Sequence, residues 1–270
     1  MKMHCSFSTD YLADFHYNNS PEAMLAPIEA AGIKEIFWTQ QGEGDFIYMK
    51  PEMREIELCV KRHNLTVDGV AAPHVPGPMR NCWSEDELKR KSGIRLIENR
   101  MELAERLGAP LVWLPAPSPL PCNKSHLMQT MERLLIAAKR HHITLAVESC
   151  REDELAFLLD NYPDDNLGWS MQTALCGLTG AFVPLLKRFG PRLALLRAGD
   201  AKYGMLRRIP FSGCLEWQKM LSAVKAVAPE AMITLDVDVY SHLECSQMEF
   251  LTRSRKAGEQ LTVLWEDSIS

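Results

Sequence analysis

The chain has 270 residues, of which 46% are hydrophobic and 24% are charged, a composition typical of a globular protein with one large α/β domain or two small ones. Its net charge of −5 argues against a nucleic-acid partner, because phosphate binding needs a basic face. No apolar run approaches the roughly 20 residues that span a bilayer, so we expect no membrane partner.

The first residues and the cysteines lead us to expect a cytoplasmic protein. The first residues, MKMHCSFSTDYLADFHY, include acidic side chains and no long apolar core, unlike a signal peptide. The eight cysteines show no C-x-x-C spacing, and several lie in or beside apolar segments. This pattern indicates free, buried thiols in a reducing compartment rather than a disulfide framework.

Strand-like and helix-like segments alternate along the chain. Apolar and β-branched runs predict strands at 3–8, 33–38, 66–72, 110–115, 143–148, 167–171, 193–198 and 231–237. Helical patterns fall between them, at 21–31, 51–63, 85–107, 124–141, 151–161, 178–189, 215–227 and 244–260. Signals at helix ends agree with these boundaries, namely Pro21, Pro51, Gly32, Gly108 and a capping box from Ser84 to Glu87.

Eight strand–helix pairs predict a single (β/α)8 TIM barrel over residues 1–270. A doubly wound open sheet is the competing fold. Its dinucleotide-binding form carries G-x-G-x-x-G after the first strand, where this chain has SFSTD.

The barrel prediction makes the carboxyl ends of the strands the place to look for chemistry. Glu148 ends the run 143–147, where a carboxylate has little access to water and needs a cation, a hydrogen-bond partner or a raised pKa. Asp236 directly follows the run 232–235, and for that reason it, rather than Asp238, is our choice for the inward-facing residue. Further candidates at this rim are Gln172, Arg197, Asp200, His74 and the aromatic residues Trp38 and Trp113.

Structural roles compete with functional ones for several of these residues. Glu148 and Asp236 could simply be structural carboxylates paired with Arg197. His74, in the proline-rich loop after the third strand, could hold a backbone carbonyl. In the loop 202–210 the adjacent Arg207 and Arg208 could both be solvated or one of them could reach the site, and Arg208 is our choice as a substrate contact.

Five segments in order carry a family likeness: AGIKEIFW, RLGAPLVWLPAP, HHITLAVES, NLGWSMQTAL and LALLRAGDAKYGMLRRIPFSGCLEW. With them the chain resembles the xylose isomerase-like TIM barrels, in particular their sugar isomerase and epimerase branch. In the fifth segment Pro210, Gly213 and Trp217 keep the outline of the family's P-x-G-x-G-x-x-W-like stretch. The resemblance covers nearly the whole chain and implies a barrel that acts on small sugars.

The resemblance also implies a divalent metal, held by Glu, Asp, His and Glu from strands 5 to 8. Glu148 matches the first ligand, and Asp236 stands at the last, one methylene shorter. Gln172 stands where the Asp is expected, with Leu175 at the histidine of the same D-x-G-H pattern. The strand-7 histidine is replaced by Arg197, and the strand-2 glutamate common in the family by Phe37 or Trp38.

This departure predicts a site without a metal. Arg197 cannot ligate a cation, because it stays protonated and has no lone pair. We expect its guanidinium to take the metal's electrostatic place between Glu148 and Asp236. Mn²⁺ or Mg²⁺ held by the two carboxylates is the alternative.

The predicted function is isomerisation or epimerisation of a sugar or sugar acid by proton transfer next to a carbonyl. Glu148 and Asp236 are assigned the proton transfers, Arg197 the polarisation of the carbonyl, and Gln172, His74, Trp113, Asp200 and Arg208 contacts with the substrate. The alternatives are a sugar-acid dehydratase that uses the same residues and a non-catalytic sugar-binding barrel. We do not expect a nuclease of the endonuclease IV type, because it would need a histidine cluster and a basic face that this sequence lacks. A homo-oligomer is a further expectation, because the segment GEQLTVLWEDSIS is apolar enough to pack on a second copy of the chain.

Overall fold

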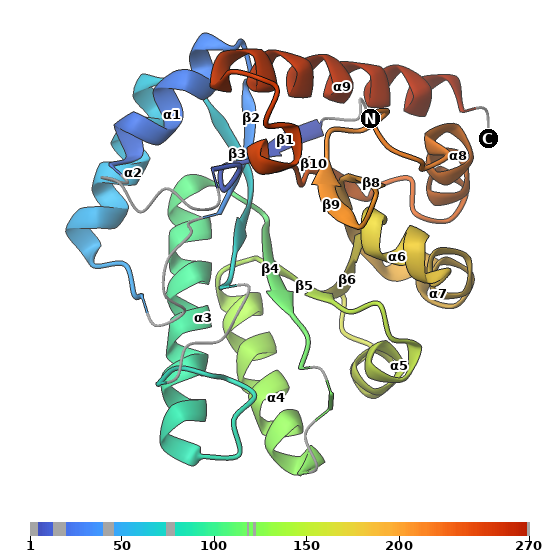
Figure 1. The fold of residues 1–270 in the computed structure, drawn as a ribbon. Helices are drawn as coiled ribbons and strands as arrows, with labels where there is room; N and C mark the ends of the chain where they lie inside the picture. Colours follow the sequence, from blue (N-terminus) through green and yellow to red (C-terminus); the bar gives the residue numbers. More distant parts are fainter. Residues whose placement is uncertain are drawn as a thin grey trace.

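Eight parallel strands form a closed barrel in the computed structural model, which describes residues 5–12, 20–39, 46–73, 79–117, 119–120 and 123–268 (Figure 1). Apolar and β-branched runs build the strands, as a parallel sheet that is covered on both faces requires. They are β1 (Cys5–Ser8), β2 (Glu35–Trp38), β3 (Thr66–Ala71), β4 (Leu111–Pro115), β5 (Thr144–Glu148), β6 (Leu167–Gln172), β7 (Leu193–Ala198) and β10 (Met232–Leu235). The last strand lies between β7 and β1 and closes the ring. The predicted TIM barrel is confirmed.

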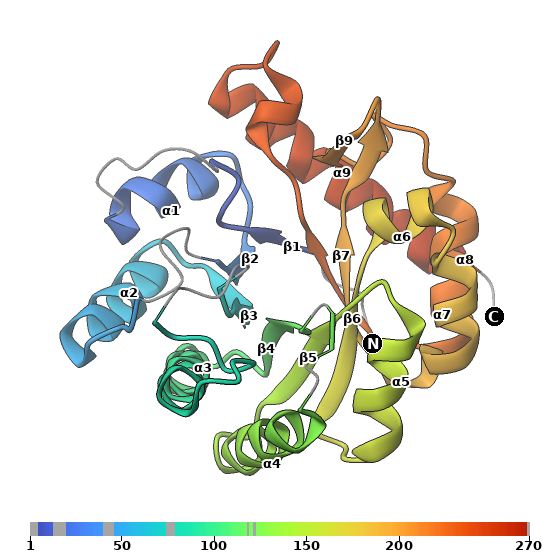
Figure 2. The same ribbon diagram turned by 60° about the horizontal axis from the view of Figure 1, so that its bottom comes forward.

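Helices surround these strands in chain order (Figure 2). They are α1 (Pro21–Ala30), α2 (Lys50–Arg62), α3 (Glu87–Leu107), α4 (Lys124–Arg140), α5 (Glu152–Asn161), α6 (Thr173–Thr179), α7 (Phe182–Phe189), α8 (Trp217–Val227) and α9 (Gln247–Asp267). Gly32 and Gly108 have the positive φ values expected after helix ends. The capping box predicted at Ser84 was wrong, because Asp86 accepts from the backbone of Leu88 and Lys89 and so caps α3.

The apolar side chains divide into two groups according to the face of the strand. Alternate residues point outward and pack with the helices in a large core. A smaller cluster fills the barrel interior: Phe37, Ala71, Leu111, Trp113, Ala146 and Leu195. Trp38 points outward, where its indole donates to the hydroxyl of Tyr48 at 2.9 Å. It is therefore a core residue and not the wall of a site, and Phe37 occupies the inward position of β2.

The second half of the chain contains elements that the sequence did not predict. After β7, β8 (Asp200–Lys202) and β9 (Met205–Arg208) form an antiparallel hairpin outside the barrel. Tyr203 and Gly204 both have positive φ, as a two-residue hairpin turn requires. The helix predicted at 178–189 corresponds to α7, and the sequence did not predict α6, which comes before it and ends at Gly180, where φ is 72°.

Three broader predictions can be compared with the described residues. Seven cysteines are described and none of them forms a disulfide. In the same part of the chain no helix is long and apolar enough to cross a membrane. Leu261 and Trp265 of the carboxyl-terminal segment are buried, in a helix that packs against α8 and β1 of its own chain. The homo-oligomer stays a prediction.

Candidate active site

Arg197 lies between two carboxylates at the carboxyl ends of the strands. It faces inward on β7, two residues after Leu195 of the inner cluster. Its Nη1 donates to Oε1 of Glu148 at 2.7 Å, and its Nη2 lies 3.0 Å from Oδ2 of Asp236. The guanidinium also lies over the ring of Trp113, 4.3 Å from the centroid, which adds a cation–π attraction.

The charge states of Arg197, Glu148 and Asp236 depend on one another. Burial by itself would lower the pKa of Arg197, but Asp236 and Glu148 raise it above the ordinary arginine value. Burial would raise the pKa of Asp236, but Arg197 and Arg207 hold it below its usual range. Asp236 is therefore a buried, ionised carboxylate, with only 1% of its side chain exposed, compared with 17% for Glu148.

A second arginine extends the cluster towards the first strand. Nε of Arg207 lies 2.8 Å from Oδ1 of Asp236, and Nη2 donates to Oδ1 of Asp10 at 2.8 Å. Arg207 has φ of 60°, an unfavourable conformation for a side chain of this size, and one that the surrounding ion pairs hold in place. Acidic and basic groups thus alternate from Glu148 through Arg197, Asp236 and Arg207 to Asp10.

The donors around the two carboxylates do not fit a divalent metal. Oε2 of Glu148 accepts from the indole of Trp113 at 3.0 Å and from the hydroxyl of Ser170 at 3.1 Å. The amide of Gln172 donates to Oδ2 of Asp236 at 2.9 Å. Mn²⁺ and Mg²⁺ bind oxygen ligands that are free to coordinate, whereas these carboxylate oxygens already contact other side chains. A divalent cation would also be repelled by the positive charge of Arg197, which cannot itself act as a ligand.

The structure brings five of the predicted site residues together: Glu148, Asp236, Arg197, Gln172 and Trp113. Asp200 lies elsewhere, fully buried. Its Oδ1 accepts from the backbone of Leu215, and its Oδ2 accepts from the indole of Trp217 at 2.9 Å. Asp200 therefore ties the start of the hairpin to the loop before α8. Its contact with substrate stays a prediction.

The side chains of the adjacent Arg207 and Arg208 make different contacts. Arg207 reaches Asp236, whereas Arg208 donates to the backbone carbonyl of Ser241 and lies beside His242. The contact of Arg208 with a substrate stays a prediction. His74 lies outside the described residues, so its predicted role stays a prediction as well.

Sequence reasoning missed Asp10, and of the two adjacent arginines it chose Arg208, whereas Arg207 is the one that joins the cluster. A signal for Asp10 was present, since SFSTD ends the first strand with an acidic residue two positions after Ser8, whose hydroxyl donates to it at 2.7 Å. The rule that selected Glu148 and Asp236 selects Asp10 too. No such signal marked Arg207, because its direction depends on the backbone turn at that residue.

Comparison with known proteins agrees with the barrel fold. The family model for xylose isomerase-like TIM barrels matches residues 25–260. The chain belongs to this family. Its barrel resembles that of D-psicose 3-epimerase from Clostridium cellulolyticum H10, with a TM-score of 0.75 and 13% identity over 97% of this chain and 99% of the other.

Other xylose isomerase-like barrels are similarly close in structure. A xylose isomerase domain protein from Alicyclobacillus acidocaldarius has a TM-score of 0.75 at 13% identity, over 98% of this chain and 99% of the other. For 3-keto-D-glucoside 4-epimerase from E. coli the TM-score is 0.68 at 13% identity, over 97% of this chain and all of the other. No curated protein sequence matches the chain. At such identities the likeness supports the fold alone.

Proposed function

We propose that this protein is an isomerase or epimerase of a small sugar or sugar acid that works by proton transfer next to a carbonyl. The observation that carries the proposal is the contact between Arg197 and Glu148 at 2.7 Å, at the carboxyl ends of the barrel strands. It places an acid–base group next to a fixed positive charge. Membership of the xylose isomerase-like family, and the sugar epimerases among its structural relatives, support the choice of substrate class.

In the proposed reaction Glu148 removes a proton from the carbon next to the substrate's carbonyl. The electrons of the C–H bond form the double bond of an enediolate, and the carbonyl oxygen takes up the negative charge. Arg197 stabilises that oxygen, since a fixed cation in a dry site costs no reorganisation when the charge develops. Returning the proton to the former carbonyl carbon gives an isomer, once the hydroxyl proton on the adjacent carbon has passed to the former carbonyl oxygen. Delivering a proton to the opposite face of the original carbon gives an epimer, and that step takes its proton from a second donor, a water molecule on that face.

We propose further that the reaction needs no divalent metal. The family's metal polarises the substrate oxygen and balances the charge of the carboxylates. Arg197 carries a positive charge between the same two strand ends, in contact with both Glu148 and Asp236. Activity should then persist after exhaustive chelation, and added Mn²⁺ or Mg²⁺ should not raise it.

Asp236 was predicted to exchange protons with the substrate, and its contacts favour another role. Two arginines stabilise its ionised form and leave 1% of the side chain exposed, so it is a weak base with little access to a ligand. We propose that Asp236 orients Arg197 and that Glu148 makes the proton transfer. The alternative is that both carboxylates exchange protons with the substrate.

The test follows exchange of the substrate's carbon-bound hydrogen with deuterated solvent over a panel of ketoses, aldoses and sugar acids. Glu148→Gln keeps the shape and should slow the exchange by about 10²–10⁴. Glu98→Gln, which alters an exposed pair with Arg133 on the outer helices, is the matched control and should exchange at the wild-type rate. If Glu148→Gln exchanges as fast as the wild type, Glu148 is not the base.

A non-catalytic sugar-binding barrel is the second candidate, because both oxygens of Glu148 and Oδ2 of Asp236 already accept hydrogen bonds, and Oδ1 of Asp236 is ion-paired with Arg207. Calorimetric titration with the same panel separates the two functions. Binding of a sugar by the wild type without any hydrogen exchange would replace the isomerase proposal with the binding protein.

A further inference from the structure

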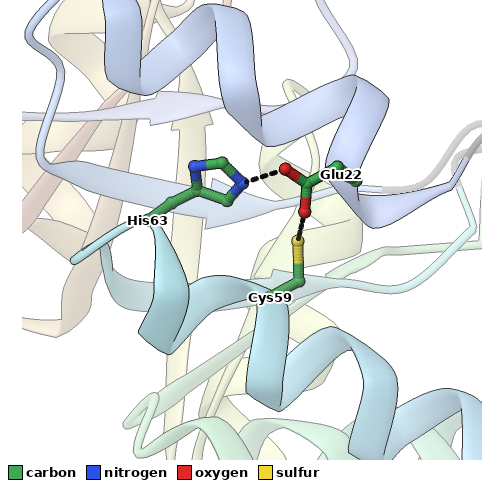
Figure 3. A group of neighbouring side chains, drawn as sticks. All are labelled: Glu22, Cys59 and His63. Carbon is green, nitrogen blue, oxygen red and sulfur yellow. Dashed lines mark hydrogen bonds and ion pairs between the residues drawn. The ribbon is translucent and has the colours of Figure 1, made fainter.

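Three potential metal ligands from two outer helices meet on the wall of the barrel, away from the active site (Figure 3). Cys59 lies on α2 and His63 caps the carboxyl end of that helix four residues later, so the two side chains lie on the same side. Glu22 comes from the first turn of α1. Its Oε1 lies 3.1 Å from Nε2 of His63, and the thiol of Cys59 donates to its Oε2 at 3.5 Å.

The spacing of these atoms fits a tetrahedral zinc ion. One donor atom from each residue lies within 4.8 Å of the other two. Ligands at the usual zinc distances of about 2.0–2.3 Å are themselves about 3.5 Å apart, so a bound ion would draw one oxygen of Glu22, the thiolate and the imidazole nitrogen together to that spacing. Among the described residues this is the only group of three or more His, Cys, Asp and Glu side chains close enough to hold one ion.

A fourth residue orients the histidine. Nδ1 of His63 lies 2.7 Å from Oε2 of Glu29, which follows Glu22 by seven residues on α1 and so shares its face. A carboxylate on the ring nitrogen that does not bind the metal is the usual support of a metal-bound histidine, because it fixes the tautomer and aims the other nitrogen at the ion. His63 is itself buried, with 6% of its surface exposed.

We propose that Glu22, Cys59 and His63 bind a zinc ion that joins α1 to α2, with water as the fourth ligand. Sulfur, imidazole and carboxylate donors together select Zn²⁺ over Mg²⁺ or Mn²⁺. The site is independent of the proposed sugar chemistry. Glu22 and Cys59 line a groove of about 300 Å³ on the surface, which lets an ion and its water reach them.

Binding requires one proton to leave. In the free protein the thiol of Cys59 donates to Oε2 of Glu22, so this cysteine carries its proton. Zinc replaces that proton, which passes to solvent, and the thiolate becomes the ligand. Arg62 also pairs with Glu22 at 2.7 Å, but such an exposed ion pair contributes little stability and gives way to the ion.

The test begins with the full-length protein freed of metal by a chelator and dialysed. Titration with Zn²⁺ against a competing chelator should give one ion per chain, and zinc should raise the melting temperature by mass action. Co²⁺ as a spectroscopic substitute should show the charge-transfer absorption of a thiolate–cobalt bond. The absence of one-to-one binding, or cobalt bound without the thiolate band, would overturn the proposal.

Variants assign the ligands. Glu22→Gln, Cys59→Ser and His63→Gln should each weaken zinc binding by at least about 100-fold. Glu29→Gln, which removes only the orienting partner, should weaken it by about 10–100-fold. Glu22 is exposed, so its variant folds even if the replacement of buried Cys59 does not.

Two matched controls complete the design. His141→Gln removes a histidine that pairs with Glu105 at 2.9 Å at the end of α4, and Cys214→Ser removes an exposed thiol. Both variants should bind zinc as the wild type does. If Glu22→Gln binds zinc as tightly as these controls, the cluster is an ion-pair network only.

Discussion

Arg197 is a buried cation whose two carboxylate partners come from different strands. A guanidinium can reach both because its nitrogens diverge in a plane, whereas a lysine ammonium is a single point on a flexible chain. Removing one side of a buried ion pair leaves an uncompensated charge, which commonly costs about 3–5 kcal/mol. The forked guanidinium of Arg197 therefore contributes to the stability of the protein as well as to the proposed chemistry.

We expect Arg197→Met to lower the free energy of unfolding by about 3–5 kcal/mol, and Arg197→Lys to lower it by less, because charge is retained while one of the two contacts is lost. Urea unfolding measures both. Arg188→Lys is the control, since Arg188 bridges Glu152 and Asp160 on the surface with 44% of its side chain exposed, and it should change stability by no more than about 1 kcal/mol. Equal losses for Arg188→Lys and Arg197→Lys would contradict the role of the buried fork.

His242 links stability to pH. Its Nε2 accepts from the backbone N–H of Ile209 at 3.0 Å, its ring is fully buried, and Arg208, Glu244 and Arg253 surround it. Burial lowers the pKa of His242 below the ordinary 6.5, and Arg208 lowers it further, against a smaller raising effect of Glu244. The unfolded chain therefore binds a proton more readily than the folded protein does.

Because the folded-state pKa is depressed, we expect the stability due to His242 to be complete above pH 6.5, to fall as the pH drops through that value, and to level off below the folded-state pKa. Denaturant unfolding at a series of pH values measures this slope. His242→Gln, which keeps an acceptor for Ile209 and does not titrate, should show a shallower slope between pH 7 and 5. Identical slopes for the two proteins would show that His242 does not contribute.

At the scale of the strands, β2 and β3 fit together only because residue 69 is glycine. Gly69 lies in register with Phe37, whose ring turns into the barrel. A Cβ on residue 69 would lie 2.2 Å from Cε2 of that ring, far inside the contact distance of two carbons. The aromatic ring at the inward position of β2 and the missing side chain on β3 therefore depend on each other.

Gly69→Ala should lower the free energy of unfolding by about 1–3 kcal/mol through overpacking. In the background of Phe37→Leu, whose side chain is shorter, the same change should cost less than half as much. A double-mutant cycle by urea unfolding gives the coupling between the two positions. Additive losses would show that the ring does not limit residue 69.

The same scale shows which elements can be predicted from sequence. The barrel strands were found because each is a short apolar run between polar helices, and Glu148 and Asp236 were found because a strand end fixes which way a side chain points. The hairpin after β7 was missed, since β8 has three residues and β9 is MLRR, too short and too polar to show a period. Its turn, which directs Arg207 inward, depends on positive φ at Tyr203 and at Arg207 itself. Tyrosine and arginine rarely adopt that conformation, so the sequence does not predict it.

At the scale of the molecule, the barrel supplies positions and the side chains supply the chemistry. The group between Glu148 and Asp236 is Arg197, a side chain of β7, at a position where the resemblance to the family led us to expect a metal ligand. The fold alone therefore gives less information about the function of this protein than the side chains at the carboxyl ends of its strands do. Retention of activity under chelation is the measurement that distinguishes this member from a metal-dependent one.

The alternating charges at the rim also set a condition on folding. Asp10 and Arg207 are 197 residues apart in the chain, and Asp236 lies just after the strand that closes the ring. Loops this long make such contacts late and slow to form. An intermediate with only the first seven barrel strands would have Glu148 and Arg197 but not Asp236. Closure of the barrel and assembly of the site should therefore be one kinetic event, and the newly made chain can acquire activity only after its last strand has been synthesised.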